Sequence, residues 1–310
     1  MEKRAIVLLS SGSPKNKKEI RKFLFNLFFD RHITPLPLML RLPVAIFLSS
    51  MRLPEARKHY ALIKGSPLIE NVKKQADLLR QRIKDDVFIC MRYSRPRAKE
   101  VVKEIKEKDI RNVVLFPLYP HYSKTTVGSS VDDFLYQIKK QNLNTNIRVI
   151  SHWHKEKRFI NIVKNLIYEE WGKMPDDLKA HSIIIFSAHS LPQKIVRNGD
   201  PYLGELKDCI NRIMKDTALD YTLSFQSKAT PVKWLEPSTE KVIKQSIKKG
   251  KKAIIIVPIS FVSEHIETLF EIDITYRDLA RREGARYFSR IKTDYICPEF
   301  IDFMKEMIND

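Results

Sequence analysis

The sequence predicts an α/β protein built from two similar half-domains, each with a parallel four-stranded sheet flanked by helices. Short runs rich in Val, Ile and Leu alternate with helical patterns along the chain, which is typical of doubly wound folds. The runs are almost continuously apolar, as expected for parallel strands buried on both faces. They also fall into two sets of four, and 310 residues are enough for two domains.

Eight runs are expected to form strands, and the stretches between them to form helices. Between residues 69 and 83, for example, apolar side chains recur every three or four positions and make a single helical stripe. The predicted strands, in chain order, cover residues 5–10, 87–93, 112–119, 147–153, 182–188, 221–227, 252–260 and 293–297.

The third strands of the two sets end alike, in LFPLYPHYS (115–123) and IIVPISFVS (255–263). Each has a proline near the strand end, followed by aromatic residues and serine. This similarity indicates two related halves with a hinge near Trp153–Lys157. We expect an N-terminal half over 1–153, a C-terminal half over 154–297, and a final helix over 298–310 that packs back on the N-terminal half.

The chain is strongly basic, with 56 Lys and Arg against 37 Asp and Glu and a formal net charge of +19. Such a charge attracts anions of several kinds. No RRM, KH or zinc-finger pattern is present, so a nucleic-acid partner is not expected. The three cysteines, Cys90, Cys209 and Cys297, exclude a disulfide scaffold and indicate a reducing compartment. With no secretory signal visible, we expect a cytoplasmic location.

One segment, residues 33–51, is apolar without resembling a strand or an ordinary amphipathic helix. Arg41 and three prolines interrupt it, so it is too short to span a membrane. Arg31, Arg41 and Arg52 rim it, a composition typical of a ligand mouth or a membrane-surface contact. We expect an exposed lip that touches the cytoplasmic face of a membrane; packing into the domain core is the alternative.

Titratable residues follow two strands of the second set, where a parallel sheet places its ligands. His189 comes directly after the fifth strand, although an isolated histidine is often an ordinary turn residue. After the seventh strand, Glu264, Glu267 and Glu271 recur at i, i+3 and i+7, which predicts one face of a helix. Acidic residues also favour helix N-termini for electrostatic reasons alone. His265 adds a second imidazole, but the spacing is not HExxH.

The other strand ends are rich in aromatic and hydroxyl groups. Arg92 and Tyr93 follow the second strand, Tyr119 and Ser123 follow the third, and Trp234 lies in the loop after the sixth. No GxGxxG or Walker sequence is present, so a nucleotide cofactor is not indicated. This set of side chains suits a large flat aromatic ligand with acidic groups, at a site that exchanges protons or binds a cation.

Seven motifs occur in an order that identifies a family. They are LLSSGSP, IKGSPL, MRYSRP, PLYPHYSKTTVGS, FSAHSLP with GDPY, FQSKATPVKWLEP, and PISFVSEHIETLFEID. Over roughly residues 5–300 the chain resembles the ferrochelatases, lyases that insert Fe²⁺ into a porphyrin to make haem and release two protons. The resemblance implies two Rossmann-like, chelatase-type halves with the active site in the cleft between them. It also implies porphyrin and Fe²⁺ as substrates, with protoporphyrin IX expected, and haem as product.

The resemblance also implies residue roles. The family's catalytic histidine falls on His189 and its acidic partner on Glu267, and these two are the expected metal contacts. His265 and Glu271, with Glu264, match an acidic path behind the site. Ser11 stands where relatives often have Met or Tyr facing the porphyrin. The remaining porphyrin-binding assignments, to the ring walls and propionate contacts, are Arg92, Tyr93, Trp234, Phe261, Tyr119, Ser123 and Arg52.

Three alternatives stay open on the sequence. One is a related tetrapyrrole chelatase, for example one inserting cobalt into sirohydrochlorin, although the apolar lip favours a porphyrin with few carboxylates. Another is a non-catalytic haem or porphyrin carrier, and the last is a nucleic-acid binder inferred from charge alone. We expect no required cofactor, because Fe²⁺ is a substrate. We also expect no [2Fe–2S] cluster, which needs several cysteines near one another.

Overall fold

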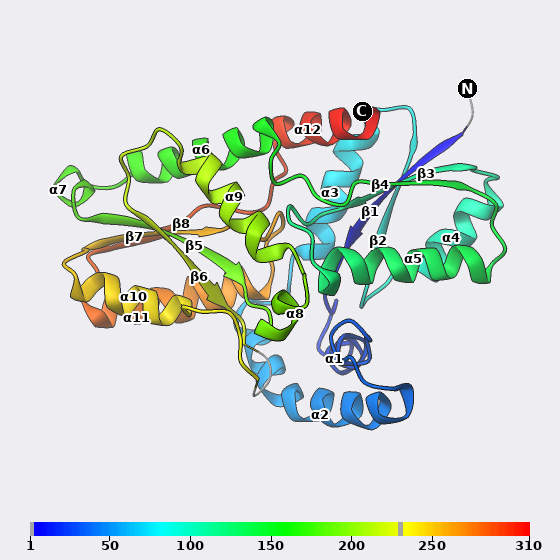
Figure 1. Cartoon of the computed structure of the whole chain (residues 1–310), viewed down its shortest axis with the longest axis horizontal. Coiled ribbons are helices and arrows are strands. Elements are labelled where there is room, and N and C mark those ends of the chain that lie inside the picture. The colour runs from blue at the N-terminus through cyan, green and yellow to red at the C-terminus, as the bar shows by residue number, and fades with distance from the viewer. Residues whose placement is uncertain (1–2, 229–231) are drawn as a thin grey trace. The chain divides into compact units, whose positions relative to one another are not determined.

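The structure, a computed structural model, describes residues 3–228 and 232–310. Its contacts divide the chain into two compact units. Unit 1 contains the residues up to His152 together with Tyr295–Asp310, and unit 2 contains Trp153–Asp294. Each unit has one parallel four-stranded sheet with helices packed on it (Figure 1). The expected α/β architecture with two four-stranded parallel sheets is therefore confirmed.

Unit 1 is built around β1, which pairs in parallel with both β2 and β3, so that the strand order is β2-β1-β3-β4. The helix at the end of the chain, α12, belongs to this unit and packs on α3. The elements of unit 1 are β1 (Arg4–Ser10), α1 (Ile20–Phe28), α2 (Leu38–Leu62), α3 (Leu68–Arg80), β2 (Asp86–Met91), α4 (Ala98–Glu107), β3 (Asn112–Pro117), the π-helix η1 (Lys124–Gly128), α5 (Ser129–Lys140), β4 (Asn146–Val149) and α12 (Pro298–Asn309).

Unit 2 repeats this topology with the order β6-β5-β7-β8, all parallel. Adding four to each strand number of unit 1 gives the order in unit 2, as the similar strand ends predicted. The elements of unit 2 are α6 (Lys157–Gly172), α7 (Asp176–Lys179), β5 (Ser182–His189), α8 (Gln193–Arg197), α9 (Tyr202–Met214), β6 (Tyr221–Gln226), α10 (Thr239–Lys248), β7 (Ala253–Pro258), the π-helix η2 (Glu267–Tyr276), α11 (Arg277–Glu283) and β8 (Tyr287–Arg290).

The central strands make the cores, as their composition predicted. Every residue of β7 is buried, and Ile254 and Ile256 pack against Val242 and Ile243 of α10. In unit 1, Val7 of β1 belongs to the cluster that α4 and α5 cover. Because both faces of these strands are covered, their carboxyl ends remain as the edge where functional side chains can be displayed.

The prediction of a strand over residues 293–297 is wrong. The eighth strand is β8, which lies a few residues earlier in the chain. It pairs with β7 and forms one edge of the sheet. All four residues of β8 are only partly buried, so it lacks the continuous apolar run of a central strand. The apolar character of 293–297 has another cause: Thr293 and Tyr295 are buried as extended chain leading to α12.

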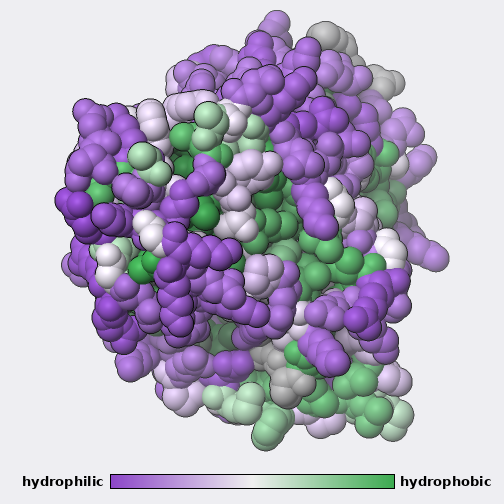
Figure 2. Space-filling view, turned by 60° about the vertical axis from the view of Figure 1, so that its left-hand side comes forward, coloured by the Kyte–Doolittle hydropathy of each residue, from purple (hydrophilic) through white to green (hydrophobic). Residues whose placement is uncertain are grey.

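The apolar segment 33–51 forms most of α2, which lies with α1 beyond the carboxyl end of β1 (Figure 1). Its apolar side chains are exposed, with 88% of Met39 and 65% of Phe47 accessible to solvent. The alternative that this segment packs wholly into the core is therefore wrong. Hydrophobic atoms gather at the lower edge of Figure 2, at the level of α2 in Figure 1. None of the described helices is both long and apolar enough to cross a membrane.

Candidate active site

The centre of the candidate site is a histidine–carboxylate pair in unit 2. His189 ends β5, and Glu267 begins η2, which follows the neighbouring strand β7. The structure brings the two side chains together, with 2.8 Å between His189 Nδ1 and Glu267 Oε2. Among the described residues, no group of three or more His, Cys, Asp or Glu side chains is arranged to hold a metal ion.

A second carboxylate, that of Glu271, lies beside this pair because η2 is a π-helix. Its wider turn brings positions four and five apart onto one face. Ser227 Oγ lies 2.8 Å from Glu267 Oε2 and 2.8 Å from both carboxylate oxygens of Glu271. The serine hydroxyl therefore bridges the two carboxyl groups. Gln226, the last residue of β6, donates from Nε2 to the Glu267 carbonyl oxygen at 3.3 Å.

The three titratable groups have divergent pKa values. Burial and the charge of Glu267 raise the pKa of Glu271 to about 8. Burial acts on Glu267 in the same direction, but His189 and His265 outweigh it and hold its pKa well below the ordinary value. For His189, burial alone would lower the pKa, yet the carboxylate of Glu267 prevails and raises it. At neutral pH, Glu267 is ionised, Glu271 is largely protonated, and His189 is biased toward imidazolium.

This ionisation pattern settles which groups donate. Because Glu267 is a carboxylate, His189 Nδ1–H donates to it, and Ser227 O–H does the same. A protonated Glu271 can in turn donate to Ser227 Oγ. A neutral His189 then carries its lone pair on Nε2, and within the described part of the chain Nε2 makes no hydrogen bond.

Two aromatic residues support the histidines of the site. Tyr202, the first residue of α9, lies 3.0 Å from the His189 carbonyl oxygen and 2.6 Å from Ser260 Oγ through its hydroxyl group. Phe261 packs against the His265 ring at a tilt of 57°, with 4.2 Å between the ring centroids. His265 Nε2 lies 3.7 Å from Glu267 Oε1, so the second imidazole approaches the carboxylate oxygen that His189 does not contact.

The predicted face containing Glu264, Glu267 and Glu271 is wrong for its first member. Glu264 precedes η2 and accepts hydrogen bonds from Arg290 Nη1 at 2.8 Å and from the Thr293 backbone N–H at 2.8 Å. The i, i+3, i+7 pattern assumed a continuous α-helix, whereas the chain is not helical at Glu264 and turns as a π-helix from Glu267 onward. Glu264 is held in a buried ion pair and does not join the other carboxylates.

In unit 1, Arg92 and Tyr93 belong to a separate buried network centred on Asp30. Arg92 lies 3.2 Å from Asp30 and 3.4 Å from Asp133, and its Nε donates to Ser129 Oγ at 2.7 Å. Tyr93 donates from its hydroxyl group to Asp30 Oδ2 at 2.8 Å. The charge of the Arg92 guanidinium is thus shared between two carboxylates.

Asp30 is fully ionised in this network. Burial would raise the pKa of its carboxyl group, but the hydrogen bond from His32 and the charge of Arg92 outweigh burial and lower the pKa far below the ordinary value. His32 also reaches Asp132, at 3.1 Å from Nε2. The network therefore connects the end of α1 with the start of α5 and the residues after β2.

Three of the other residues of unit 1 that were predicted to contact the porphyrin are Tyr119, Ser123 and Arg52. Tyr119 follows β3, and burial raises the pKa of its hydroxyl group to about 12. Ser123 is buried and caps η1 by accepting a hydrogen bond from the Thr125 backbone N–H at 3.2 Å. Arg52 lies on α2 and pairs with Glu55 at 2.8 Å. Arg52 is not part of the Asp30 network.

Trp234 lies in unit 2, partly exposed, in the loop that follows β6. It forms a bridge with Pro192, three residues after His189, and its carbonyl oxygen accepts a hydrogen bond from Gln193 Nε2 at 3.0 Å. These contacts attach the tryptophan loop to the segment that follows the catalytic strand β5. Residues 229–231 of the FQSKATP motif lie outside the described residues.

Sequence reasoning missed Ser227 and Asp30. Ser227 follows β6 within a motif that was recognised, so its position at a strand end was a usable signal. Asp30 follows α1, far from any strand end, and its isolated carboxyl group resembles an ordinary surface residue in the sequence. Only the fold brings it to Arg92 and Tyr93.

A family model described as Ferrochelatase matches residues 3–310. The chain belongs to the ferrochelatase family. A ferrochelatase from Rickettsia felis is 43% identical over 94% of this chain and 86% of its own length. Another, from Sulfurihydrogenibium sp., is 36% identical over 99% of this chain and 98% of its own length. A ferrochelatase from a Wolbachia endosymbiont of Drosophila simulans is 39% identical, with 98% of each chain covered.

Family membership fixes the reaction: Fe²⁺ enters a porphyrin to form haem, which makes the chain a porphyrin metal chelatase and a lyase of haem biosynthesis. The fold agrees. The sirohydrochlorin chelatase SirB from Bacillus subtilis, solved with Fe³⁺, superposes with a TM-score of 0.61 over 98% of this chain and 95% of its own. At 8% sequence identity this similarity concerns the fold alone.

Proposed function

We propose that this chain inserts Fe²⁺ into protoporphyrin IX, and that His189 and Glu267 form the acid–base and metal-contacting unit. The observation that carries the proposal is the 2.8 Å contact between His189 Nδ1 and Glu267 Oε2 at the carboxyl edge of the unit 2 sheet. A parallel sheet places its ligands at this edge.

The reaction needs a base, because a free-base porphyrin carries two N–H protons that must leave when the metal enters. Glu267 accepts Nδ1–H of His189 and so fixes the tautomer in which Nε2 holds the lone pair. In this proposal Nε2 takes a pyrrole proton or contacts Fe²⁺, for which imidazole and carboxylate are both suitable ligands. Imidazolium can do neither, so His189 acts in its neutral form.

The released protons need an exit, and the proposal assigns it to Ser227, Glu271 and His265. A pKa of about 8 allows Glu271 to exchange protons near neutral pH. Its link through Ser227 to Glu267, with 2.8 Å on each side, is a hydrogen-bonded chain along which a proton can move. His265 contacts Glu267 from another direction and completes the set.

Porphyrin binding is assigned to aromatic walls and polar contacts. The walls grip the ring and favour its bent form, which tips a pyrrole lone pair out of plane and lowers the barrier. Arg92 contributes a fixed cation already oriented by Asp30 and Ser129. The proposed walls are Tyr93, Tyr119, Trp234 and Phe261, and the proposed polar contacts are Arg92, Arg52, Ser123 and Ser11.

The proposal includes no resident cofactor or iron–sulfur cluster. Two of the three cysteines, Cys90 and Cys209, are buried in the cores, which does not suit a cluster site. It also includes peripheral contact of α2 with the cytoplasmic face of a membrane, supported by the exposed side chains of Met39, Ile46 and Phe47. Haem and protoporphyrin have a largely apolar ring apart from their propionates, which suits an enzyme working at such a surface.

Anaerobic insertion assays test the substrate assignment. Purified chain is mixed with Fe²⁺ or Co²⁺ and with protoporphyrin IX, coproporphyrin or sirohydrochlorin, and the absorbance of the metallated product is followed. We expect the highest kcat/KM for Fe²⁺ with protoporphyrin IX. Faster cobalt insertion into sirohydrochlorin would move the chain to the related chelatase activity, and binding without turnover would make it a carrier.

A further inference from the structure

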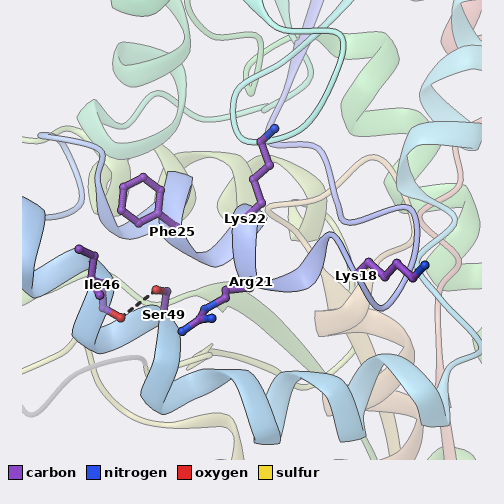
Figure 3. A pocket seen from close by; sticks show the side chains of 6 residues that line it. All are labelled: Lys18, Arg21, Lys22, Phe25, Ile46 and Ser49. Atoms are coloured by element: carbon purple, nitrogen blue, oxygen red, sulfur yellow. Dashed lines mark hydrogen bonds between the residues drawn. The ribbon is translucent and has the colours of Figure 1, made fainter.

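A cavity of about 450 Å³ lies between α1 and α2, and none of its lining residues is assigned to the reaction (Figure 3). Its volume is within the range of about 300–1,000 Å³ that is common for small-molecule sites. Half of its lining is cationic and the rest is mostly apolar. The lining residues are Lys18, Arg21, Lys22, Phe25, Ile46 and Ser49.

The cationic part comes from one face of the first helix. Lys18, Arg21, Lys22 and Phe25 recur at i, i+3, i+4 and i+7, so all four lie on the same side of α1 and the turn before it. Within the described chain, no carboxylate forms an ion pair with Lys18, Arg21 or Lys22. Three positive charges are therefore left without a protein counter-charge at one cavity.

Arg21 is positioned more firmly than the lysines. Figure 3 shows it extending toward α2, where its Nη2 donates to Ser50 Oγ at 3.1 Å. Lys18 and Lys22 extend in other directions. A guanidinium held by one hydrogen bond keeps its remaining N–H groups for an anion and can bind phosphate in a bidentate manner.

The cavity opens beside the exposed apolar surface of α2. Ile46 belongs to both, since it lines the cavity and is half exposed. The other large apolar side chains exposed on this helix up to Met51 are Leu38, Met39, Leu40, Leu42, Phe47 and Met51. A small soluble anion would contact only the cationic lining of the cavity. A lipid can contact the cationic lining with its charged headgroup and the apolar side chains of α2 with its acyl chains.

We infer that this cavity is a binding site for the headgroup of an anionic phospholipid, with the acyl chains against α2. The inference rests on the proposed membrane contact and adds to it a specific site and a preference for negative lipids. Arg21 binds the phosphate, Lys18 and Lys22 add electrostatic attraction, and Phe25 and Ile46 pack on the glycerol and first methylene groups. The site would orient the enzyme on the bilayer through α1 as well as α2.

Vesicle co-sedimentation of the full chain tests the inference. The vesicles are pure phosphatidylcholine or phosphatidylcholine with one-third phosphatidylglycerol. The test variant is Lys18→Gln/Arg21→Gln/Lys22→Gln. The matched control, Lys84→Gln/Lys99→Gln/Lys305→Gln, removes the same charge at exposed lysines of unit 1 that have no ion pair among the described residues. A basic residue near an anionic surface contributes about fivefold in affinity.

We expect wild type to prefer the anionic vesicles and the test variant, which loses three basic residues, to lose roughly 100-fold in apparent affinity for them. The control variant should change by less than about threefold, because none of its lysines lines the cavity. Equal losses in the two variants would mean that net charge alone drives binding and would overturn the site. Equal binding of wild type to both kinds of vesicle would also overturn it.

Two further measurements separate the outcomes. Calorimetry with inorganic phosphate in the absence of lipid should show no saturable binding by wild type; submillimolar binding lost in the test variant would assign the cavity to a soluble phosphate instead. Iron insertion in detergent solution should be the same in wild type and both variants, since no altered residue is assigned to the reaction. Absent insertion in all three would reject the proposed function and leave the lipid measurements valid.

Discussion

Each unit holds a carboxylate centre beside residues that we propose to bind the ligand, and the two centres are opposite in character. In unit 1, Asp30 lies against Arg92 and accepts hydrogen bonds from Tyr93 and His32, so its pKa is far below the ordinary range. In unit 2, Glu271 faces another carboxylate instead of a cation, and its pKa rises to about 8. One centre is locked in a single charge state, and the other changes its state near neutral pH.

The difference follows from the neighbouring groups: Asp30 is the more buried of the two, yet its carboxyl group has the lower pKa. A buried carboxylate with a cationic partner stays ionised and holds that partner in place, which suits a binding surface. Titratable groups whose environments push their pKa values apart are suited to acid–base chemistry. The comparison thus predicts that changes in unit 2 alter the reaction, whereas changes in unit 1 alter stability and the binding geometry.

The largest expected effect is on turnover. His189→Ala and Glu267→Gln should each lower the rate of iron insertion by about 10²–10⁴-fold, the range for a lost general base. Because the two residues act as a unit, the double variant should be little worse than the poorer single variant. Anaerobic assays at saturating porphyrin measure the rates, and fluorescence quenching measures porphyrin binding, which should survive.

The matched control for the histidine change is His181→Ala, an exposed histidine at the far end of β5. It should insert iron at the wild-type rate. Near-normal insertion by His189→Ala would remove the histidine from the proposed mechanism, and additive losses in the double variant would separate its role from that of Glu267.

The second prediction contrasts stability in the two centres. Asp30→Asn removes the charge that Arg92 and His32 require, so the free energy of unfolding at pH 7 should fall by about 3 kcal/mol. Glu271→Gln should change it by less than about 1 kcal/mol, because Glu271 is already mostly protonated at that pH. Urea denaturation monitored by circular dichroism measures both. Equal losses of unfolding free energy in the two variants would contradict the proposed difference between the two carboxylate centres.

The sign of the pH dependence gives an internal check on Asp30. Its pKa is lower in the folded protein, so its contribution is present above the unfolded value of about 4 and is lost as the pH falls below it. The stability difference between wild type and Asp30→Asn should therefore be constant from pH 5 to 7 and narrow toward pH 3. A difference that grew at acid pH would contradict the assignment.

The third prediction concerns the titration of His189. Glu267 raises the pKa of the imidazole above the ordinary value of about 6.5, so the acid limb of the insertion rate should lie above that pH. Glu267→Gln should lower the His189 pKa by about one pH unit or more, as measured from imidazole chemical shifts by NMR. Glu271→Gln should lower it less, because Glu271 is mostly uncharged below pH 8. Equal shifts in both variants would contradict the assigned charges.

The strands of both sheets, except the eighth, were predictable because continuous Val, Ile and Leu runs have few other structural explanations. The eighth was missed since β8 is a half-buried edge strand without such a run. His189 and Glu267 were predictable because they follow adjacent parallel strands, so topology alone brings them near each other. Glu264 was misplaced because α-helical spacing does not hold across the start of a π-helix. Asp30 was missed because its partners come from distant segments.

The smallest expected effect isolates the hydroxyl group of Ser227, which bridges Glu267 and Glu271 at 2.8 Å. Its backbone has φ +66°, a conformation that favours glycine, so two substitutions can separate side chain from backbone. Both Ser227→Gly and Ser227→Ala remove the bridge and should lower kcat by roughly tenfold with little change in KM, the cost of about one charge-assisted hydrogen bond. Of the two, only the glycine variant should gain about 1 kcal/mol of stability, because it removes the Cβ that serine and alanine both hold at this positive φ. Wild-type turnover in Ser227→Gly with a deficit in Ser227→Ala would show that the backbone matters and the bridge does not, and proton exit would then need another path from Glu267.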